Sequence, residues 1–296
     1  MMPHSRWDGP RHGNQTRSRS IGLRLCLLLC LVCAIVLPCY PGDATSAILP
    51  SIGMGQGIDV YSAKGAEAWP VLTYIPSAGH GRLRGNWLAS LFVPQGIVFA
   101  TFDYAVDPGR VPLGSMEDVA RAVAWIHDHA KAFGGDPQRI IIMGFSAGAH
   151  MAALLSTDER YLQQQGKSLS ILSGAVILDN DVFSPVDSSA RAGQFDPWGG
   201  VAADASTAWE AVTPGSYVEP GKGIPPMLIV CSGTLTGRRG QDVFGFMELL
   251  ATAGVEAQLV HAPEKSHESI FSNLDAPGDS VCEAILRFAL EDRSQF

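Results

Sequence analysis

A serine within the pattern G-x-S-x-G is the residue in this chain most suited to covalent chemistry. Residues 144–148 read Gly-Phe-Ser-Ala-Gly. The isoleucine-rich run 139–143 before them predicts a strand, and the run 149–155 after them predicts a helix. On so sharp a strand-to-helix turn a serine hydroxyl is lifted clear of the sheet, and flanking glycines remove side chains that would collide. We predict that Ser146 is a nucleophile, in preference to a structural turn serine.

A nucleophilic serine needs a general base, and His267 is our candidate. In chains built around this turn the histidine comes last, in the loop after the final strand. Residues 255–261 predict that strand, and His267 lies six residues beyond it. The other histidines outside the N-terminal segment are expected to be structural: they are His127 and His129, which point to different faces of a helix, His150 in the helix after Ser146, and His261 in the last strand.

Two other kinds of chemistry find no support in the sequence. No Cys or His cluster has the spacing of zinc ligands, and no glycine-rich loop precedes a Lys-Ser/Thr pair. We therefore expect neither a metal nor a cofactor.

The elements that must position Ser146 and His267 follow an alternating pattern. Short apolar or β-branched runs alternate with helical periodicity, as in a parallel sheet with crossover helices. No repeat or low-complexity linker divides residues 48–296, so we expect a single α/β domain without a large separate cap. Its predicted strands are 58–61, 71–75, 97–102, 139–143, 175–178, 227–231 and 255–261.

Three further helices are predicted from spacing and end signals. Apolar residues from Val119 to Phe133 recur at helical spacing. We expect Ser115 and Asp118 to form the capping box at the start of that helix. The other two helices cover about 241–253 and 281–290.

Composition and charge restrict the class of partner. The chain is 46% hydrophobic and 17% charged, so it can bury a core and is not intrinsically disordered. The net charge is −8, and residues 48–296 alone hold 16 basic against 27 acidic side chains. Nucleic acid and an anionic membrane surface are therefore unexpected partners. The oligomeric state is not determined by the sequence.

The first 47 residues resemble a targeting segment. An arginine-rich stretch leads into the apolar run 25–37, which at 13 residues is too short to span a bilayer comfortably. Small residues precede a cleavage position after Ala47, so we expect secretion or export to a periplasm, with an uncleaved membrane anchor as the alternative. Four of six cysteines lie in this segment. We expect Cys231 and Cys282 to be buried thiols.

Nearly all of residues 55–290 resembles the α/β-hydrolases, and within them the esterases and lipases that include feruloyl-esterase-like and arylformamidase-like enzymes. Residues 57–61 look like the family's entry strand and 225–230 like its seventh strand. Residues 134–140, followed by Ser146-Ala147-Gly148, look like its approach to the nucleophile. The resemblance implies an α/β-hydrolase fold with a mostly parallel sheet flanked by helices.

The chain departs from the family pattern in the loop that supplies the oxyanion hole. Where the family has His-Gly-Gly-Gly after the third strand, this chain has Pro76-Ser77-Ala78-Gly79. An oxyanion hole uses backbone N–H groups, but proline has none. The resemblance therefore implies Ala147, Ser77 and Ala78 as donors.

A second departure concerns the acid that orients the histidine. The family's usual aspartate position falls on Leu235. Asp179 directly follows the strand 175–178, which corresponds to the family's sixth strand. Some lipases carry their acid after that strand, so we put forward Asp179 as a relocated acid. Two alternatives stay open: Asp242 carries this role, or Asp179 and Asp181 merely cap or turn the chain.

The resemblance and the residues together predict a serine carboxylesterase. Ser146 would attack a small to medium carboxylic ester, His267 would shuttle the proton, and an acyl-enzyme would form. The alternatives are an arylformamidase-like amidase and a non-catalytic binding protein of the same fold.

Overall fold

The computed structural model describes residues 44–48, 57–77, 85–105, 113–180, 182–184 and 211–291. The chain divides into two units, residues 1–38 and 39–296, and every described residue belongs to the second. The apolar run 25–37 therefore lies outside the described residues. In the part of the chain that is described, none of the helices combines the length and apolarity needed to cross a bilayer.

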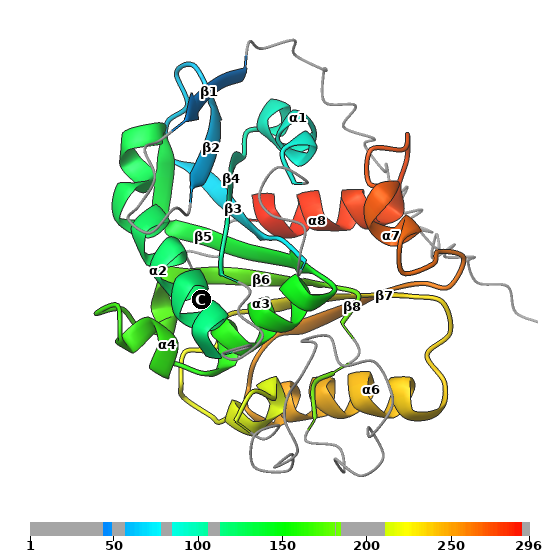
Figure 1. Ribbon diagram of the computed structural model, residues 1–296. Coiled ribbons are helices and arrows are strands. Elements are labelled where there is room, and N and C mark those ends of the chain that lie inside the picture. The colour runs from blue at the N-terminus through cyan, green and yellow to red at the C-terminus, as the bar shows by residue number, and fades with distance from the viewer. Residues whose placement is uncertain are drawn as a thin grey trace, which may run out of the picture. The chain divides into compact units, whose positions relative to one another are not determined.

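The core of the second unit is one sheet, whose described strands follow the order β1-β2-β4-β3-β5-β6-β7-β8 (Figure 1). β1 and β2 pair antiparallel, as do β2 and β4, and the remaining neighbours are parallel. The predicted class, a mostly parallel sheet in an α/β domain, is confirmed. The strands are β1 Ala44–Ile48, β2 Ile58–Ala63, β3 Trp69–Ile75, β4 Val98–Phe102, β5 Gly135–Phe145, β6 Leu172–Leu178, β7 Met227–Ser232 and β8 Ala257–Ala262.

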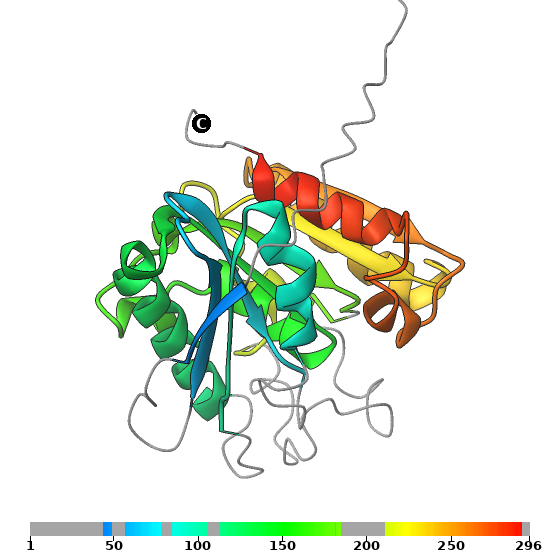
Figure 2. The ribbon, with the colours of Figure 1, turned by 90° about the horizontal axis from the view of Figure 1, so that it is seen from above.

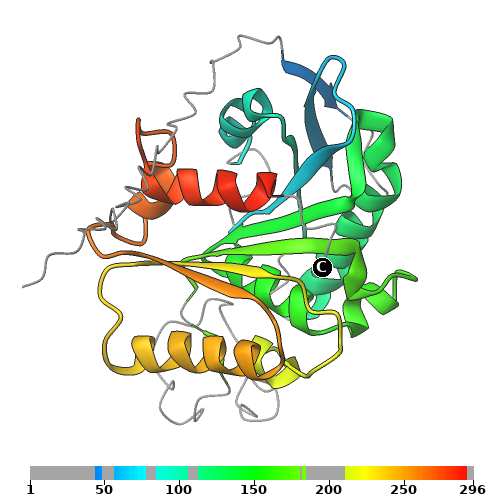
Figure 3. The same cartoon turned by 180° about the vertical axis from the view of Figure 1, so that it is seen from behind.

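Helices cover both faces of this sheet (Figures 2 and 3). α2, α3, α4 and α6 pack on one face, while α1, α7 and α8 pack on the other. The α-helices are α1 Trp87–Phe92, α2 Leu113–His129, α3 Ala147–Thr157, α4 Arg160–Gln163, α6 Gly237–Thr252, α7 Ser269–Ser272 and α8 Ser280–Leu290. Short 3₁₀ helices span Val93–Gln95, Ala130–Phe133, Leu169–Ile171 and Pro214–Tyr217.

All seven predicted strands and all four predicted helices are present, because their apolar patterns match the faces that are buried. On α2, Val119, Val123 and Ile126 are fully buried against the sheet. Strands β3, β4, β6 and β7 and the second half of β5 are buried on both faces, as expected for parallel strands between helix layers. Cys231 and Cys282 are buried thiols, as predicted.

One local prediction is wrong. α2 begins at Leu113, so Ser115 lies inside its first turn and cannot be the residue that precedes the helix. The hydroxyl of Ser115 donates to the carbonyl of Ala105, and the carboxylate of Asp118 accepts from the amide of Ala105. The two side chains therefore tie α2 to the chain that leaves β4, since polar side chains near a helix start can bind backbone groups outside the helix.

Candidate active site

The carboxyl ends of β5, β6 and β7 lie level with one another. Phe145 pairs with Leu178, and Leu178 pairs with Val230. Residues that follow these positions leave the sheet at one edge, so Ser146 and Asp179 come close although they are far apart in the sequence. Ligands of open α/β sheets bind at this edge of the strands.

The turn at Ser146 is strained and tightly packed. Ser146 has φ 56° and ψ −120°, a backbone conformation that L-residues rarely adopt. A β-carbon on Gly144 would lie 2.0 Å from the carbonyl oxygen of Gly148, and one on Gly148 would lie 2.1 Å from the carbonyl oxygen of Ile75. Only glycine fits at both positions. The two glycines of the motif thus permit the turn that presents Ser146.

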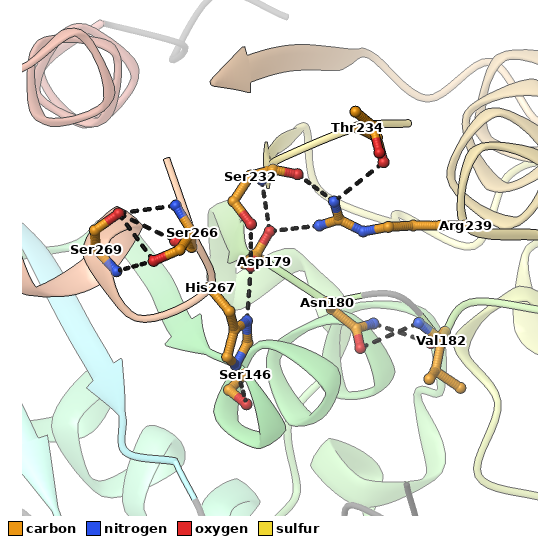
Figure 4. A network of polar contacts seen from close by, with 10 residues as sticks. All are labelled: Ser146, Asp179, Asn180, Val182, Ser232, Thr234, Arg239, Ser266, His267 and Ser269. Atoms are coloured by element: carbon orange, nitrogen blue, oxygen red, sulfur yellow. Dashed lines mark hydrogen bonds and ion pairs between the residues drawn. The ribbon is translucent and has the colours of Figure 1, made fainter. Parts of the chain in front are cut away.

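The loop that carries His267 is held at both of its ends. The amide of Ser266 donates to Ser269 Oγ at 2.8 Å, and the amide of Ser269 donates back to Ser266 Oγ at 3.1 Å (Figure 4). The amide of Gly233, just past β7, donates to the carbonyl of Lys265 at 2.9 Å. These bonds fix the backbone on each side of His267.

Ser146, His267 and Asp179 form a hydrogen-bonded series (Figure 4). His267 Nε2 lies 3.0 Å from Ser146 Oγ, and His267 Nδ1 lies 2.6 Å from Asp179 Oδ2. The ring of Phe145 stacks on the imidazole, with centroids 4.8 Å apart. The side chain of His267 is 54% exposed and that of Asp179 only 1%, so a substrate can reach the base but not the acid. This geometry suits removal of the serine proton by the imidazole.

The carboxylate of Asp179 accepts more than the histidine. Ser232 donates its amide to Oδ1 and its hydroxyl to Oδ2, both at 2.7 Å, and Arg239 Nη2 lies 2.7 Å from Oδ1. Burial by itself raises the pKa of the Asp179 carboxyl, but the bonds from His267 and Ser232 and the charge of Arg239 outweigh it and hold the pKa below its usual range. Asp179 is therefore ionised at neutral pH.

Ser232 and Arg239 are absent from the sequence-based set of site residues. Arg239 is 60 positions from Asp179 in the chain, and no motif links them. The available signal for Ser232 was its place directly after the predicted strand 227–231, beside the strand that Asp179 follows.

Asp242, the alternative acid, has a different position. It is buried on α6, where its carboxylate accepts from the amides of Phe183 at 2.9 Å and Ser184 at 3.0 Å. The Nδ1 atom of His267 faces Asp179 instead. The structure thus brings Asp179 to the histidine and places Asp242 against the backbone that follows β6. Asp181 lies outside the described residues.

Two of the three expected oxyanion donors can be located. Ala147 is the first residue of α3, and an N–H at that position has no acceptor within its own helix. Ser77 is buried, and the carbonyl of Pro76 before it accepts from the hydroxyl of Tyr104 at 2.7 Å. A β-carbon on Gly148 would lie 2.9 Å from that same carbonyl oxygen, so the chain to Ser77 passes beside the turn. Ala78 lies outside the described residues.

Two of the remaining histidines contact backbone carbonyl oxygens. His150 is buried, and its ring nitrogens lie 3.2 and 2.7 Å from the carbonyl oxygens of Val182 and Val212. His261 contacts the carbonyl of Gly233. Within the described ranges, no three His, Cys, Asp or Glu side chains gather in a way that could hold a metal ion.

A separate cleft of about 610 Å³ opens near the amino ends of the central strands. Its lining includes Arg139, Ser170, Ser173 and Glu256 but no histidine. Because a serine without a base is a weak nucleophile, this cleft does not compete with Ser146 as the reactive centre.

Solved structures with the same fold include esterases. Esterase 2 of Thermogutta terrifontis with bound butyrate aligns with a TM-score of 0.60 and 22% identity, covering 84% of this chain and 92% of that chain. The same esterase phosphonylated by sarin aligns with a TM-score of 0.59 and 21% identity, covering 83% and 92%. At this identity the likeness establishes the α/β-hydrolase fold.

Curated relatives match a shorter part of the chain. The isoprenylcysteine alpha-carbonyl methylesterase ICME of Arabidopsis thaliana is 33% identical over 86 residues, which are 29% of this chain and 20% of that protein. Esterase LipQ of Mycobacterium tuberculosis is 37% identical over 101 residues, 32% of this chain and 24% of that protein. The matched region thus spans about a fifth to a quarter of the length of these relatives.

A family model matches a larger share of this chain. The model of the BD-FAE family matches residues 61–234, more than half of the 296-residue chain. That range holds Ser146 and Asp179 together with β3 to β7. This chain therefore belongs to the BD-FAE family, within the α/β-hydrolase esterases.

Proposed function

We propose that this protein is a serine carboxylesterase that hydrolyses small to medium carboxylic esters through an acyl-enzyme. The observation that carries the proposal is the hydrogen-bonded series Ser146 Oγ, His267 Nε2 and Nδ1, Asp179 Oδ2, with contacts of 3.0 and 2.6 Å. A nucleophile, a base and a group that orients the base are the three parts that acyl transfer requires.

In the first half of the reaction, Ser146 Oγ attacks the ester carbonyl carbon while His267 Nε2 takes the hydroxyl proton. The negative oxygen of the tetrahedral intermediate would accept N–H bonds from Ala147 and Ser77. When the intermediate collapses, the C–O bond to the alcohol breaks and His267 returns the proton to the leaving oxygen. Asp179 stabilises the imidazolium between these two steps.

In the second half, water takes the place of the alcohol. His267 removes a proton from the water, whose oxygen attacks the acyl carbon bound to Ser146. Collapse of the second intermediate releases the carboxylic acid, and the proton returns to Ser146 Oγ. The balance is one ester and one water to one acid and one alcohol, so no cofactor is needed.

The first test is hydrolysis of p-nitrophenyl esters from acetate to long acyl chains by the full-length chain and by Ser146→Ala. We expect turnover of the short esters and a loss of about 10⁴-fold or more in kcat in Ser146→Ala. The matched control is Ser170→Ala, which removes an exposed hydroxyl far from the turn and should leave kcat unchanged.

A fluorophosphonate probe tests the nucleophile without reference to the substrate. We expect Ser146 to be labelled in the parent and in Ser170→Ala, and no labelling in Ser146→Ala. A parent that neither reacts with the probe nor hydrolyses any ester or aryl formamide would favour a non-catalytic binding protein. Hydrolysis of the formamide alone would favour the amidase.

We also propose that the N-terminal segment directs export, with cleavage after Ala47. The support is the sequence: an arginine-rich start, the 13-residue apolar run 25–37 and small residues before the cleavage position. Cleavage there would remove four of the five residues of β1, leaving β2 as the edge strand. N-terminal sequencing of exported protein tests this, and an intact Met1 would indicate an anchor.

A further inference from the structure

Asp179 occupies an unusual place for a charged side chain. The whole residue is 3% exposed, and its φ is 59°, in the left-handed region that favours glycine. A buried carboxylate is costly unless it is paired and hydrogen-bonded, and a left-handed backbone adds strain. Strong partners must therefore hold Asp179 in this position.

The partners divide evenly between the two carboxylate oxygens. Oδ2 accepts from His267 Nδ1 and the hydroxyl of Ser232, and Oδ1 accepts from the amide of Ser232 and from Arg239 Nη2. A carboxylate has about four acceptor positions, and all four are used here. Rotation of the carboxylate would break the bond to Arg239 as well as the bond to the imidazole.

Arg239 is itself fixed by the end of β7. It starts from the first turn of α6, and its Nη1 contacts the carbonyl oxygen of Ser232, with that of Thr234 at 3.5 Å (Figure 4). Its side chain is 21% exposed. The guanidinium thus lies between α6 and the strand end, with one nitrogen on the acid and another on the backbone beside it.

We propose that Arg239 is a positioning residue for the hydrogen-bonded series of Ser146, His267 and Asp179. It holds Asp179 as an ionised, fixed acceptor and so keeps His267 neutral in the resting enzyme. This rests on the proposed function, in which His267 must begin each cycle as a base. Of the residues that donate to Asp179, Arg239 is the permanent cation. With it in place, the buried carboxylate is neutralised without a proton on the imidazole.

Removal of the guanidinium changes which group neutralises Asp179. The remaining donors are Ser232, which is uncharged, and His267, which can supply a positive charge only by binding a proton. The pKa of His267 is then expected to rise by about one unit. The negative charge of Asp179 is no longer neutralised by Arg239, so it stabilises the protonated imidazole more strongly. The proton-free base becomes scarcer near neutral pH, and kcat falls.

Other charged groups near the imidazole are unchanged by a substitution at Arg239. Asp179 faces the ring from the end of β6, while Ser146 at the start of α3 and Phe145 at the end of β5 are uncharged. The charged residues of the histidine's own loop and helix α7 are Glu264, Lys265 and Glu268, of which Lys265 is paired with Asp279.

The experiment is an NMR titration of the His267 imidazole in the full-length protein, Arg239→Met, Arg239→Lys and Arg238→Met. Arg238→Met is the matched control, since it removes the neighbouring exposed arginine of the same helix turn. We expect the titration midpoint of His267 to rise by about one unit in Arg239→Met, less in Arg239→Lys, and not at all in Arg238→Met. Equal midpoints in all four proteins overturn the proposal.

The pH profile of p-nitrophenyl acetate hydrolysis supplies the second readout. In Arg239→Met the acid limb of kcat should move to higher pH by the same amount. KM should stay within about twofold of the parent, because the guanidinium binds Asp179 and the carbonyl of Ser232 rather than the Ser146 side of the imidazole. A uniform loss of activity with an unmoved limb indicates a merely structural role. If the parent is inactive on esters, the proposed function fails, while the NMR titration still decides the role of Arg239.

Discussion

Asp179 and Asp242 are two buried aspartates whose carboxylates accept from different kinds of donor. Asp179 follows β6 and accepts from an imidazole, a serine and a guanidinium, whereas Asp242 lies in α6 and accepts from the backbone amides of Phe183 and Ser184. Burial is therefore shared by a carboxylate that accepts from an imidazole and by one that holds a chain segment. The identity of the donors, rather than the depth of the carboxylate, separates the two.

The strongest test of this difference is Asp179→Asn. An amide in this position presents a donor or a weaker acceptor to His267 Nδ1 and favours the wrong tautomer. We expect kcat on p-nitrophenyl acetate to fall by about 10⁴-fold with KM little changed. A circular dichroism spectrum like the parent's shows that the variant is folded. Full activity in folded Asp179→Asn contradicts the role of Asp179 as the acid.

The opposite pattern is expected for Asp242→Asn. This change removes the charge that receives two amide bonds, so the free energy of unfolding should fall by about 1.5–3 kcal/mol. Because the carboxylate of Asp242 accepts from Phe183 and Ser184 while His267 Nδ1 faces Asp179, kcat should remain within about threefold of the parent. Denaturant unfolding and the same ester assay measure both quantities. A loss of kcat as large as that of Asp179→Asn would erase the distinction between the two aspartates.

A smaller effect is expected for Ser232→Ala, which sharpens the account of Asp179. The variant loses the hydroxyl bond to Oδ2 but keeps the backbone amide bond to Oδ1. A net hydrogen bond to a charged group contributes about 1.5–3 kcal/mol, of which the retained donors recover part, so we expect a fall in kcat of about tenfold. Ser170→Ala serves as the control. An unchanged kcat would show that Arg239 and the amide suffice.

The smallest effect concerns acid stability. The folded-state pKa of Asp179 lies below its unfolded value of about 3.9, so its contribution is complete above that value and is lost as the pH falls through the folded pKa. Between about pH 5 and pH 2, Asp179→Asn should lose less of its unfolding free energy than the parent. Denaturant unfolding across this range measures the difference in slope. Parallel curves would mean that Asp179 titrates alike in both states.

Features set by neighbouring residues could be predicted from the sequence. The strand, turn and helix around Ser146 follow from apolar runs and from two glycines whose β-carbons would collide with nearby carbonyls. The helix over Val119–Ile126 and the seven strands follow from periodicity, because local patterns record which face will be buried. The loop position of His267 also follows, since the order of elements decides it.

Features set by contacts between distant residues needed the tertiary structure. The capping prediction failed because Ser115 and Asp118 bind Ala105, a partner on the preceding segment. By sequence, Asp179 was the proposed acid and Asp242 the alternative, and the register of β5, β6 and β7 shows which one meets His267. Ser232 and Arg239 were not found, because a hydrogen bond across 53 or 60 residues leaves no local pattern.

The sequence by itself determined the elements, their order and the nucleophile turn, since these depend on short-range sterics and on the period of apolar residues. The tertiary structure alone decided which aspartate meets His267 and which serine and arginine bind that aspartate. Those choices depend on strand register and on where α6 starts relative to the end of β6, and such distances arise only when the sheet has formed.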